Sequence, residues 1–334
     1  MIITRSFISK FVALSVGLFC IFLAYEYNKK NNYLYEGEIY GTYWKITSRE
    51  FINQQYIDQV ENILNEIDFI ASNYKEASEI NKLNFYGINN EFFLSKDLYN
   101  ILKIAIEVSD KTNGIYDITV GSVVNNLGFG PDLFLDKNYV YEPYPNKFTI
   151  NDSLKSLTKH KETTFDLSSV AKGYAVDAVS NYLQLNNFNN YLIDIGGEIA
   201  ANGLSNNGNW IIGIQDPQSL NQKVSFTITN SNNFIGVATS GDYLNYKYID
   251  GELVTHTIDP RINKSKDNDV LSVTVIDNES VSRADAFATA FNVMSINESI
   301  KLLESLNIKV KIIYLEDGLI NYFESKSWQN MKYE

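Results

Sequence analysis

The chain is poor in several residue types that would define whole classes of protein. It has one cysteine in 334 residues, so it forms no internal disulfide and depends on a packed core for stability. Basic residues are also scarce: 28 Lys and Arg stand against 40 Asp and Glu, a formal net charge of −12. Such a surface repels phosphate backbones, which argues against a DNA or RNA partner.

A long apolar run occurs at the N-terminus. Arg5 and Lys10 precede the run 11–25, and a polar stretch over 26–34 follows and is interpreted as a linker. A positively charged start before an apolar run is typical of an export signal. The sequence therefore predicts export from the cytoplasm.

The form of this N-terminal segment has two interpretations. Cys20 lies where a bacterial lipoprotein cysteine often falls, but the bulky Phe19 stands before it, where such signals use a small residue. An uncleaved membrane anchor is therefore favoured, with a lipoprotein as the alternative. The chain is divided into residues 1–32, the anchor and linker, and residues 33–334, one globular domain.

Hydrophobic spacing predicts the main elements. Apolar residues that recur every three or four positions predict helices. These helices cover residues 52–70, 97–110, 169–185, 282–294 and 298–306. Short apolar segments predict strands over residues 35–47, 163–167, 191–195, 210–214, 224–229, 234–238, 271–276, 309–315 and 319–323. Because the helices are too few and too irregularly placed for strict βαβ alternation, the predicted fold class is α+β.

His256 lies in the stretch that is richest in functional groups. Asp242 precedes it behind a Ser-Gly turn, and Asp259-Pro260-Arg261 follows it. Histidine titrates near neutral pH, so His256 is a candidate general acid or base. The alternative is a plain hairpin built from the same residues. His160, between two lysines, is interpreted as a solvated loop residue.

Two further segments could bind an anion and a metal ion. After Asp166, small residues lead into a helix whose free N–H groups could face an anion, and Lys172 would add a positive charge for a phosphate. Asp285 and Thr289 are four residues apart, so a helix presents both on one face, and their oxygens are suitable ligands for a hard cation such as Mg²⁺. The alternatives are ordinary helix starts, the first capped by Ser168 or Ser169 and the second by Ser282.

Two loops carry aromatic residues that could stack on a planar ring. One is Gly128-Phe129-Gly130-Pro131, and the other contains Tyr74. The alternatives are a core phenylalanine at a long turn and an ordinary surface tyrosine. Gly196-Gly197, followed by Glu198, allows a tight turn but lacks the spacing of a nucleotide-binding fingerprint.

Taken in order, these segments resemble the ApbE family of FAD:protein FMN transferases over about residues 35–325. The resemblance rests on ten motifs, namely residues 41–43, 72–74, 78–84, 116–121, 128–131, 166–176, 195–198, 239–243, 256–261 and 284–286. It implies an ApbE-like, T-fold-related arrangement of mixed sheets with packed helices, in two intertwined lobes around a flavin cleft.

The resemblance also implies an activity and a location. Members of this family are exported, membrane-attached bacterial enzymes that transfer FMN from FAD to a threonine or serine hydroxyl of a target protein and release AMP. The implied cofactor is Mg²⁺, with FAD as substrate. The acceptor would be a membrane redox-complex subunit or an extracytoplasmic electron carrier with a Thr/Ser flavinylation motif, and the enzyme would be anchored to the inner membrane and face the periplasm. Two alternatives remain: Mg²⁺-dependent hydrolysis of FAD to FMN and AMP, and a non-catalytic FAD carrier.

The same resemblance implies the roles of individual residues. The metal would be held by the backbone carbonyl of Ser169 and the side chains of Asp285 and Thr289. His256 would take the proton of the acceptor hydroxyl, with Asp242 beside the attacked phosphorus. Contacts to FAD are expected at Tyr40, Tyr74, Leu127, Gly128, Phe129, Asp166, Lys172, Ile258 and Asp259. Tyr40 stands where the family usually has Met, and Leu127 where it usually has Trp.

Overall fold

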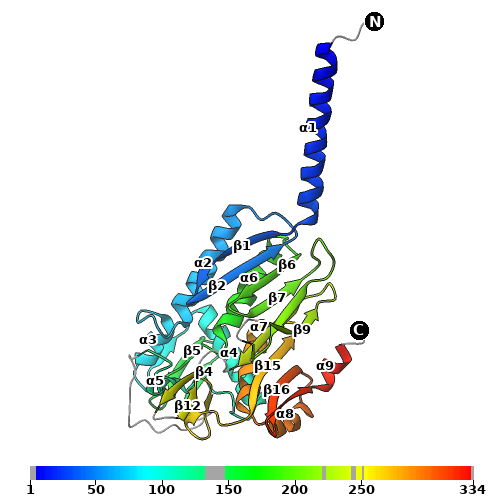
Figure 1. The fold of residues 1–334 in the computed structure, drawn as a ribbon. Coiled ribbons are helices and arrows are strands. Elements are labelled where there is room, and N and C mark those ends of the chain that lie inside the picture. The colour runs from blue at the N-terminus through cyan, green and yellow to red at the C-terminus, as the bar shows by residue number, and fades with distance from the viewer. Residues whose placement is uncertain (1–4, 132–146, 220–222, 242–245, 250–251, 332–334) are drawn as a thin grey trace.

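One eight-stranded sheet forms the centre of the computed structural model (Figure 1). The structure describes residues 5–131, 147–219, 223–241, 246–249 and 252–331. The strand order is β1-β2-β6-β7-β10-β15-β16-β17, and each of these neighbouring pairs is antiparallel. The strands are β1 (Tyr33–Ile39), β2 (Thr42–Ser48), β6 (Tyr191–Ile195), β7 (Glu198–Asn202), β10 (Ile235–Gly241), β15 (Val270–Asp277), β16 (Lys309–Glu316) and β17 (Leu319–Glu324).

The helices of the body include four that pack over this sheet in two layers. Their bounds are α2 (Gln54–Ala71), α3 (Glu79–Phe85), α4 (Lys96–Lys111), α5 (Gly121–Asn126), α6 (Ala171–Leu185), α7 (Val281–Val293), α8 (Ile296–Leu303) and α9 (Lys326–Met331). Helix α7 packs on β10 and β15, and α6 packs on α7, β6 and β7; α2 and α4 then cover α6 and α7. This order places the first turns of α6 and α7 in the interior.

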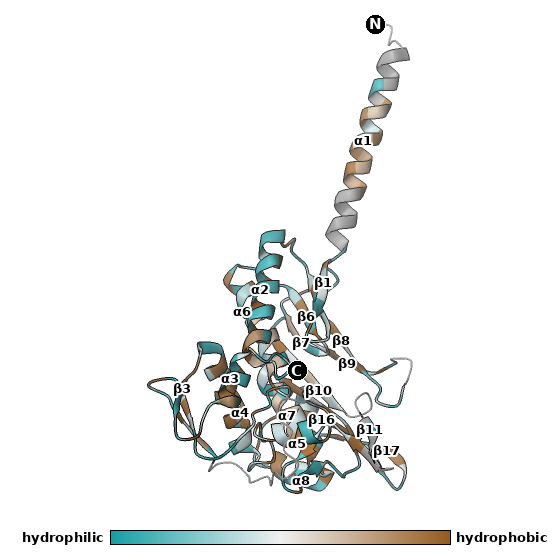
Figure 2. Cartoon of the chain, turned by 90° about the vertical axis from the view of Figure 1, so that its left-hand side faces the viewer, coloured by the Kyte–Doolittle hydropathy of each residue, from teal (hydrophilic) through white to brown (hydrophobic). Residues whose placement is uncertain are grey.

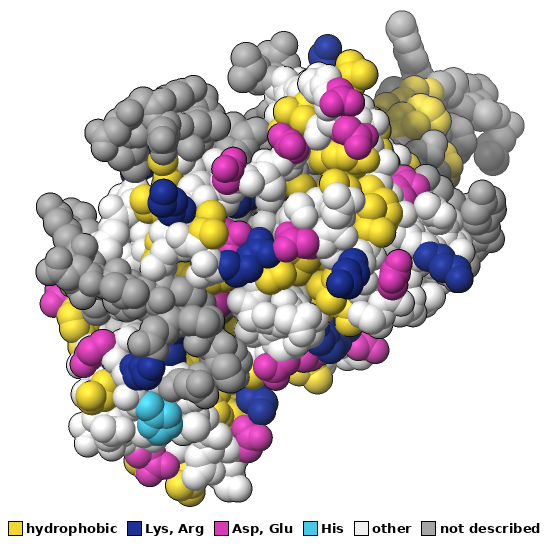
Figure 3. All heavy atoms as spheres, turned by 90° about the horizontal axis from the view of Figure 1, so that it is seen from below, with side chains coloured by type: hydrophobic (Ala, Val, Ile, Leu, Met, Phe, Trp, Pro, Cys, Tyr) yellow, Lys and Arg dark blue, Asp and Glu magenta, His cyan; other side chains and the backbone are white. Residues whose placement is uncertain are grey.

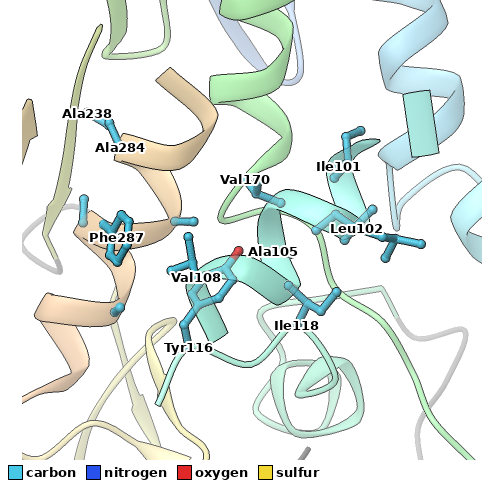
Figure 4. Packing of buried hydrophobic residues seen from close by; sticks show 14 of the residues in the cluster. Ile101, Leu102, Ala105, Val108, Tyr116, Ile118, Val170, Ala238, Ala284 and Phe287 are labelled. Atoms are coloured by element: carbon cyan, nitrogen blue, oxygen red, sulfur yellow. The ribbon is translucent and has the colours of Figure 1, made fainter. Parts of the chain in front are cut away.

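The core divides into two large hydrophobic clusters. One joins α4, α7 and the segments around Tyr116 and Val170, whose side chains converge in Figure 4. The other joins α2, α6 and the strands β2 and β6. Tyr174 of α6 packs against both clusters, so the two halves of the body share one helix.

Smaller sheets surround the main one. The hairpin β8 (Ile211–Gln215) and β9 (Val224–Thr229) packs with Trp328 of α9 against Val237 of the main sheet. A three-stranded sheet contains β3 (Glu91–Phe93), β5 (Ser156–Lys159) and β4 (Phe148–Asn151) in that order. Two short pairs, β11 (Tyr246–Ile249) with β12 (Glu252–Thr255) and β13 (Ile258–Asp259) with β14 (Lys264–Ser265), complete the end opposite the N-terminus (Figure 1).

The predicted α+β class is confirmed, and several element predictions are corrected. The described ladders are antiparallel, and the parallel pairing among the described residues is the isolated bridge between Val120 and Thr164. The strand predicted over 163–167 is therefore wrong. The strand predicted over 35–47 is two strands, because Tyr40 and Gly41 turn the chain with φ values of 55° and 70°.

The predicted helix starts need correction as well. Helix α6 begins after Val170, which has no side-chain cap, so neither Ser168 nor Ser169 caps it. Helix α7 is capped by Ser280, whose side chain accepts the N–H of Arg283, and not by Ser282.

The N-terminal residues form one helix, α1 (Arg5–Lys30), which projects away from the body (Figures 1 and 2). It extends into the stretch predicted as a linker. The side chains from Val12 to Leu23 are exposed, including that of Cys20. Within the described ranges, no helix is long and apolar enough to cross a membrane.

Candidate active site

A close approach of α6 and α7 builds the buried part of the site. A Cβ on Gly173, in the first turn of α6, would lie 2.6 Å from Ser282 Cα, so glycine is required there. The Gly173 N–H donates to Asp285 Oδ2 at 3.2 Å. One turn further along α6, Asp177 accepts the N–H groups of Val281 at 2.7 Å and Ser282 at 3.0 Å. Two contacts from α6 therefore fix the position of α7 and of Asp285.

A lysine lies among the buried carboxylates of this region. Lys172 Nζ contacts Glu198 Oε1 at 2.5 Å, on the first residue of β7. Burial raises the pKa of Glu198 to about 8, although the charge of Lys172 opposes this shift. Burial also raises the pKa of Asp285, again against the effect of Lys172. The ammonium group of Lys172 thus contacts Glu198 and opposes the rise in the pKa of both carboxyl groups, and its contact with a phosphate stays a prediction.

The oxygens predicted to hold a metal ion are compatible with Mg²⁺. Asp285 is buried, and the half-buried hydroxyl of Thr289, one turn later, bonds to no described residue. Ser169 precedes α6, and its Oγ lies 2.9 Å from the hydroxyl of the buried Tyr116. Carboxylate, hydroxyl and carbonyl oxygens are ligands that hard cations prefer. Across the described residues, no cluster of three or more His, Cys, Asp and Glu offers a competing metal site.

A second group of predicted residues gathers around Phe129. The Tyr74 hydroxyl donates to Phe129 O at 2.7 Å, and the ring centroids of Phe129 and His256 are 6.3 Å apart in an edge contact. Leu127 and Phe129 pack against the cluster that contains the buried Ile258. The structure thus brings together residues from three distant parts of the sequence.

Lys247 adds a positive charge to this loop. Its Nζ lies 4.8 Å from the centre of the Phe129 ring and donates to the carbonyl oxygen of Gly128. Gly128 has a φ of 74°, which turns the chain just before the aromatic tip. The loop 127–129 is therefore held by Tyr74 on one side and by β11 on the other.

Asp166 lies between the two groups. Its N–H donates to Ile118 O at 2.7 Å, and its Oδ1 accepts the N–H of Ser168 at 2.8 Å. Burial, followed by the negative charge of Asp166, raises the pKa of Tyr74. Asp166 also contributes to the raised pKa of Tyr116, whose main cause is burial. The half-buried Asp166 thus lies close to both the aromatic loop and the proposed metal ligands.

Other predicted residues are placed less centrally. His256 is half-buried between β12 and β13, while Asp242 lies outside the described residues. The carboxylate of Asp259 is bound by Arg261, through Nε at 2.9 Å and Nη2 at 2.7 Å. The Tyr40 hydroxyl donates to Leu64 O at 2.8 Å, in the interface with α2.

The sequence interpretation did not assign several residues that shape this site. Tyr116 and Glu198 both lie inside motifs that carry the resemblance, so their position was a usable signal. Asp177 and Lys247 have no local signal, because their partners lie far away in the sequence. The prediction for His160 is confirmed: it is exposed, with Nε2 3.1 Å from Thr149 Oγ1.

The charged side chains at the end opposite α1 are of both signs. Figure 3 shows acidic and basic side chains interspersed with hydrophobic ones over this face. No single sign of charge dominates the part that is drawn in colour.

Solved structures of flavin transferases share this fold. The flavin transferase ApbE from Vibrio cholerae superposes with a TM-score of 0.78 at 30% identity, covering 90% of this chain and 99% of that chain. The apo form of the Pseudomonas stutzeri flavinyl transferase ApbE gives a TM-score of 0.79 at 24% identity, covering 90% and 96%, which is a likeness of fold. The fold is thus that of the flavin transferases, and the predicted ApbE-like architecture is confirmed.

Curated relatives define the family. A FAD:protein FMN transferase from Vibrio cholerae serotype O1 is 34% identical over 276 residues, which cover 80% of this chain and 82% of that protein. One from Haemophilus influenzae is 32% identical over 283 residues, covering 81% and 80%. The sequence model of the ApbE family matches residues 40–313. The chain belongs to the ApbE family.

Proposed function

We propose that this chain is a FAD:protein FMN transferase, which moves FMN from FAD to a threonine or serine hydroxyl of a target protein and releases AMP. The observation that carries this proposal is the position of Asp166. It is three residues before Ser169, a proposed metal ligand, and close enough to Tyr74, which bonds to the Phe129 loop, to add to the rise that burial causes in that residue's pKa, in a chain whose relatives bear this name. A flavin ring and a pyrophosphate need these two environments side by side.

The proposed reaction is a displacement at phosphorus. The acceptor hydroxyl oxygen attacks the phosphorus of the FMN half of FAD, and the bond from that phosphorus to the bridging oxygen breaks. AMP leaves with the bridging oxygen, and the hydroxyl proton passes to His256, because an unactivated hydroxyl is a poor nucleophile near pH 7. Asp242, outside the described residues, is the second candidate base.

The buried half of the site would hold a divalent cation, for which Mg²⁺ is proposed. The Ser169 carbonyl and the side chains of Asp285 and Thr289 would bind it. A cation there neutralises the pyrophosphate and stabilises the charge that builds on the leaving AMP. Glu198 keeps Lys172 from forming an ion pair with Asp285, which leaves that carboxylate available as a ligand.

The exposed half of the site would hold the flavin. Tyr74 and Phe129 present aromatic rings, and the loop of Phe129 packs against an apolar cluster that contains Ile258. Asp166 can accept hydrogen bonds at the junction of the two halves. These contacts leave the acceptor hydroxyl to approach from the side of His256.

We also propose a location in the bacterial cell envelope, attached to the inner membrane through α1 and facing the periplasm. The support is the charged start of the chain and the exposed apolar side chains between Val12 and Leu23. Acceptors would then be subunits of membrane redox complexes or extracytoplasmic electron carriers. Fractionation of cells tests this: the full chain should sediment with membranes and residues 33–334 should not, whereas release by Cys20→Ser would indicate a lipoprotein.

The mass of an acceptor protein tests the activity. The chain is incubated with FAD, Mg²⁺ and a flavin-acceptor domain that carries a threonine motif. The proposal predicts one added FMN on the acceptor, and no addition when the acceptor threonine is changed to valine. Free FMN and AMP without an adduct would indicate a hydrolase, and unchanged bound FAD would indicate a carrier.

A further inference from the structure

Residues 163–169 form no described ladder, yet they carry two residues of the proposed site. The peptide groups of the buried Phe165 bond to asparagine side chains instead. Asn84 Oδ1 accepts the Phe165 N–H at 2.7 Å, and Asn84 Nδ2 donates to Phe165 O at 3.1 Å. Asn73 Nδ2 donates to the same carbonyl at 2.7 Å. Asn84 thus takes the place of a neighbouring strand for one residue.

The same helix also fixes the turn that carries Tyr74. Asn81 Nδ2 donates to Asn73 O at 2.7 Å and to Lys75 O at 3.0 Å, the carbonyls on either side of Tyr74. Asn81 is fully buried, and Asn84 lies three residues later on the same face of α3. Asn84 Nδ2 also lies 3.4 Å from Asn81 Oδ1, so the two amides are in contact.

A carboxamide is the side chain that suits this task. It offers donors and an acceptor without a charge, so it can be buried against peptide groups and satisfy both the N–H and the C=O. The backbone of α3 is held in turn, because Lys159 Nζ on β5 donates to Asn84 O at 2.7 Å. Helix α3 is therefore attached both to the small sheet and to the site.

We propose that Asn81 and Asn84 are positioning residues: one amide-bearing face of α3 holds Tyr74 and the segment Asp166–Ser169 in register with each other. The inference rests on the proposed function, in which Tyr74 and Asp166 contact FAD and Ser169 contacts the metal. Neither asparagine touches the substrate. Their effect on binding must therefore pass through the residues that they hold.

A double-mutant cycle on FAD binding tests the Tyr74 side. Flavin fluorescence of the full chain gives the dissociation constant of FAD. Asn81→Ala should weaken binding about tenfold in the parent, but less than about twofold in a Tyr74→Ala background, since the contact that it positions is already gone. The matched control is Asn65→Ala, an exposed amide of α2 that donates to Glu61 O and should change nothing. An equal loss in both backgrounds, or no loss in the parent, would overturn the proposal.

The metal side is tested through thermal protection by Mg²⁺. Asn84→Ala should raise the half-protecting Mg²⁺ concentration about tenfold, while Asn81→Ala should leave it within about twofold. If Asn84→Ala does not fold, Asn73→Ala removes one bond to Phe165 O and should raise that concentration about threefold. No change in either variant would overturn the proposal.

Both readouts are binding measurements, so they are independent of transfer. A parent chain that binds FAD and Mg²⁺ but adds no FMN to an acceptor would contradict the proposed function and leave this inference intact. A parent that binds neither would contradict both.

Discussion

The two halves of the site are held in place in different ways. Asp285 is buried and fixed by a peptide N–H across two packed helices, and the buried Glu198 contacts the half-buried Lys172 nearby. Tyr74 is 69% exposed, and its ring is fixed by one hydrogen bond to a loop. The proposed metal half is therefore placed by close helix packing. On the proposed flavin side the ring of Tyr74 is exposed and can adapt to a ligand, although Asn81 holds the backbone on either side of it.

The largest effect is expected from replacing the buried carboxylate of Asp285. Asp285→Asn should lower the rate of FMN transfer at least about 100-fold, because an amide binds a hard cation poorly. The rate of acceptor mass gain measures this. Asp110→Asn, at an exposed position near the end of α4, is the control and should retain the parent rate.

The packing of α6 against α7 can be disturbed without replacing a proposed ligand. Gly173→Ala places a Cβ 2.7 Å from Val281 O, so the helices must separate, and we expect a loss of about 1–3 kcal/mol in the free energy of unfolding. Denaturant unfolding measures the loss. Gly17→Ala, where a Cβ meets nothing within 4 Å, should cause none. Equal stability of both variants would contradict the close contact.

The buried charge predicts a pH dependence of stability in metal-free buffer. The pKa of Glu198 is raised from 4.5 to about 8, so the folded state holds a proton that the unfolded state releases. The free energy of unfolding should therefore fall as pH rises from 4.5 to 8, by at most about 1.4 kcal/mol per pH unit for this group. Glu198→Gln should flatten that slope. An unchanged slope would show that Glu198 is already ionised.

The exposed half should respond more weakly. Tyr74→Phe removes the bond to Phe129 O but keeps the ring, so the dissociation constant of FAD should rise about fivefold. Tyr322→Phe is the matched control. Tyr322 is an exposed tyrosine on β17, the last strand of the main sheet. A fall in the rate of FMN transfer as large as that expected for Asp285→Asn would contradict the difference between the two halves.

Local patterns predicted those elements whose partners are strands or a hydrophobic core. The predicted strands 191–195 and 224–229 coincide with β6 and β9, and the helix 97–110 differs from α4 by one residue at each end. In the segment 163–167, however, the peptide groups of Phe165 bond to the side chain of Asn84 on α3 and not to a neighbouring strand, which no local pattern reveals. Strand β7 was not predicted: a tight turn was expected at Gly196-Gly197, but no strand was assigned to the residues after it.

Site prediction reached a similar limit. Motif order identified Tyr74, Phe129 and His256, and the structure brings these residues together. The contact between Lys172 and Glu198 could not be predicted, because the two residues lie 26 positions apart in the sequence. Charge pairing across a sheet depends on the fold, which spacing alone does not give.

The most direct test of the two-part site is the affinity for FAD measured with and without Mg²⁺. In the parent, Mg²⁺ should tighten FAD binding. In Asp285→Asn, the account predicts that this effect disappears while the metal-free affinity stays within about twofold of the parent, since the aromatic half still holds the flavin. A large loss of metal-free affinity, or a parent that does not respond to Mg²⁺, would contradict it.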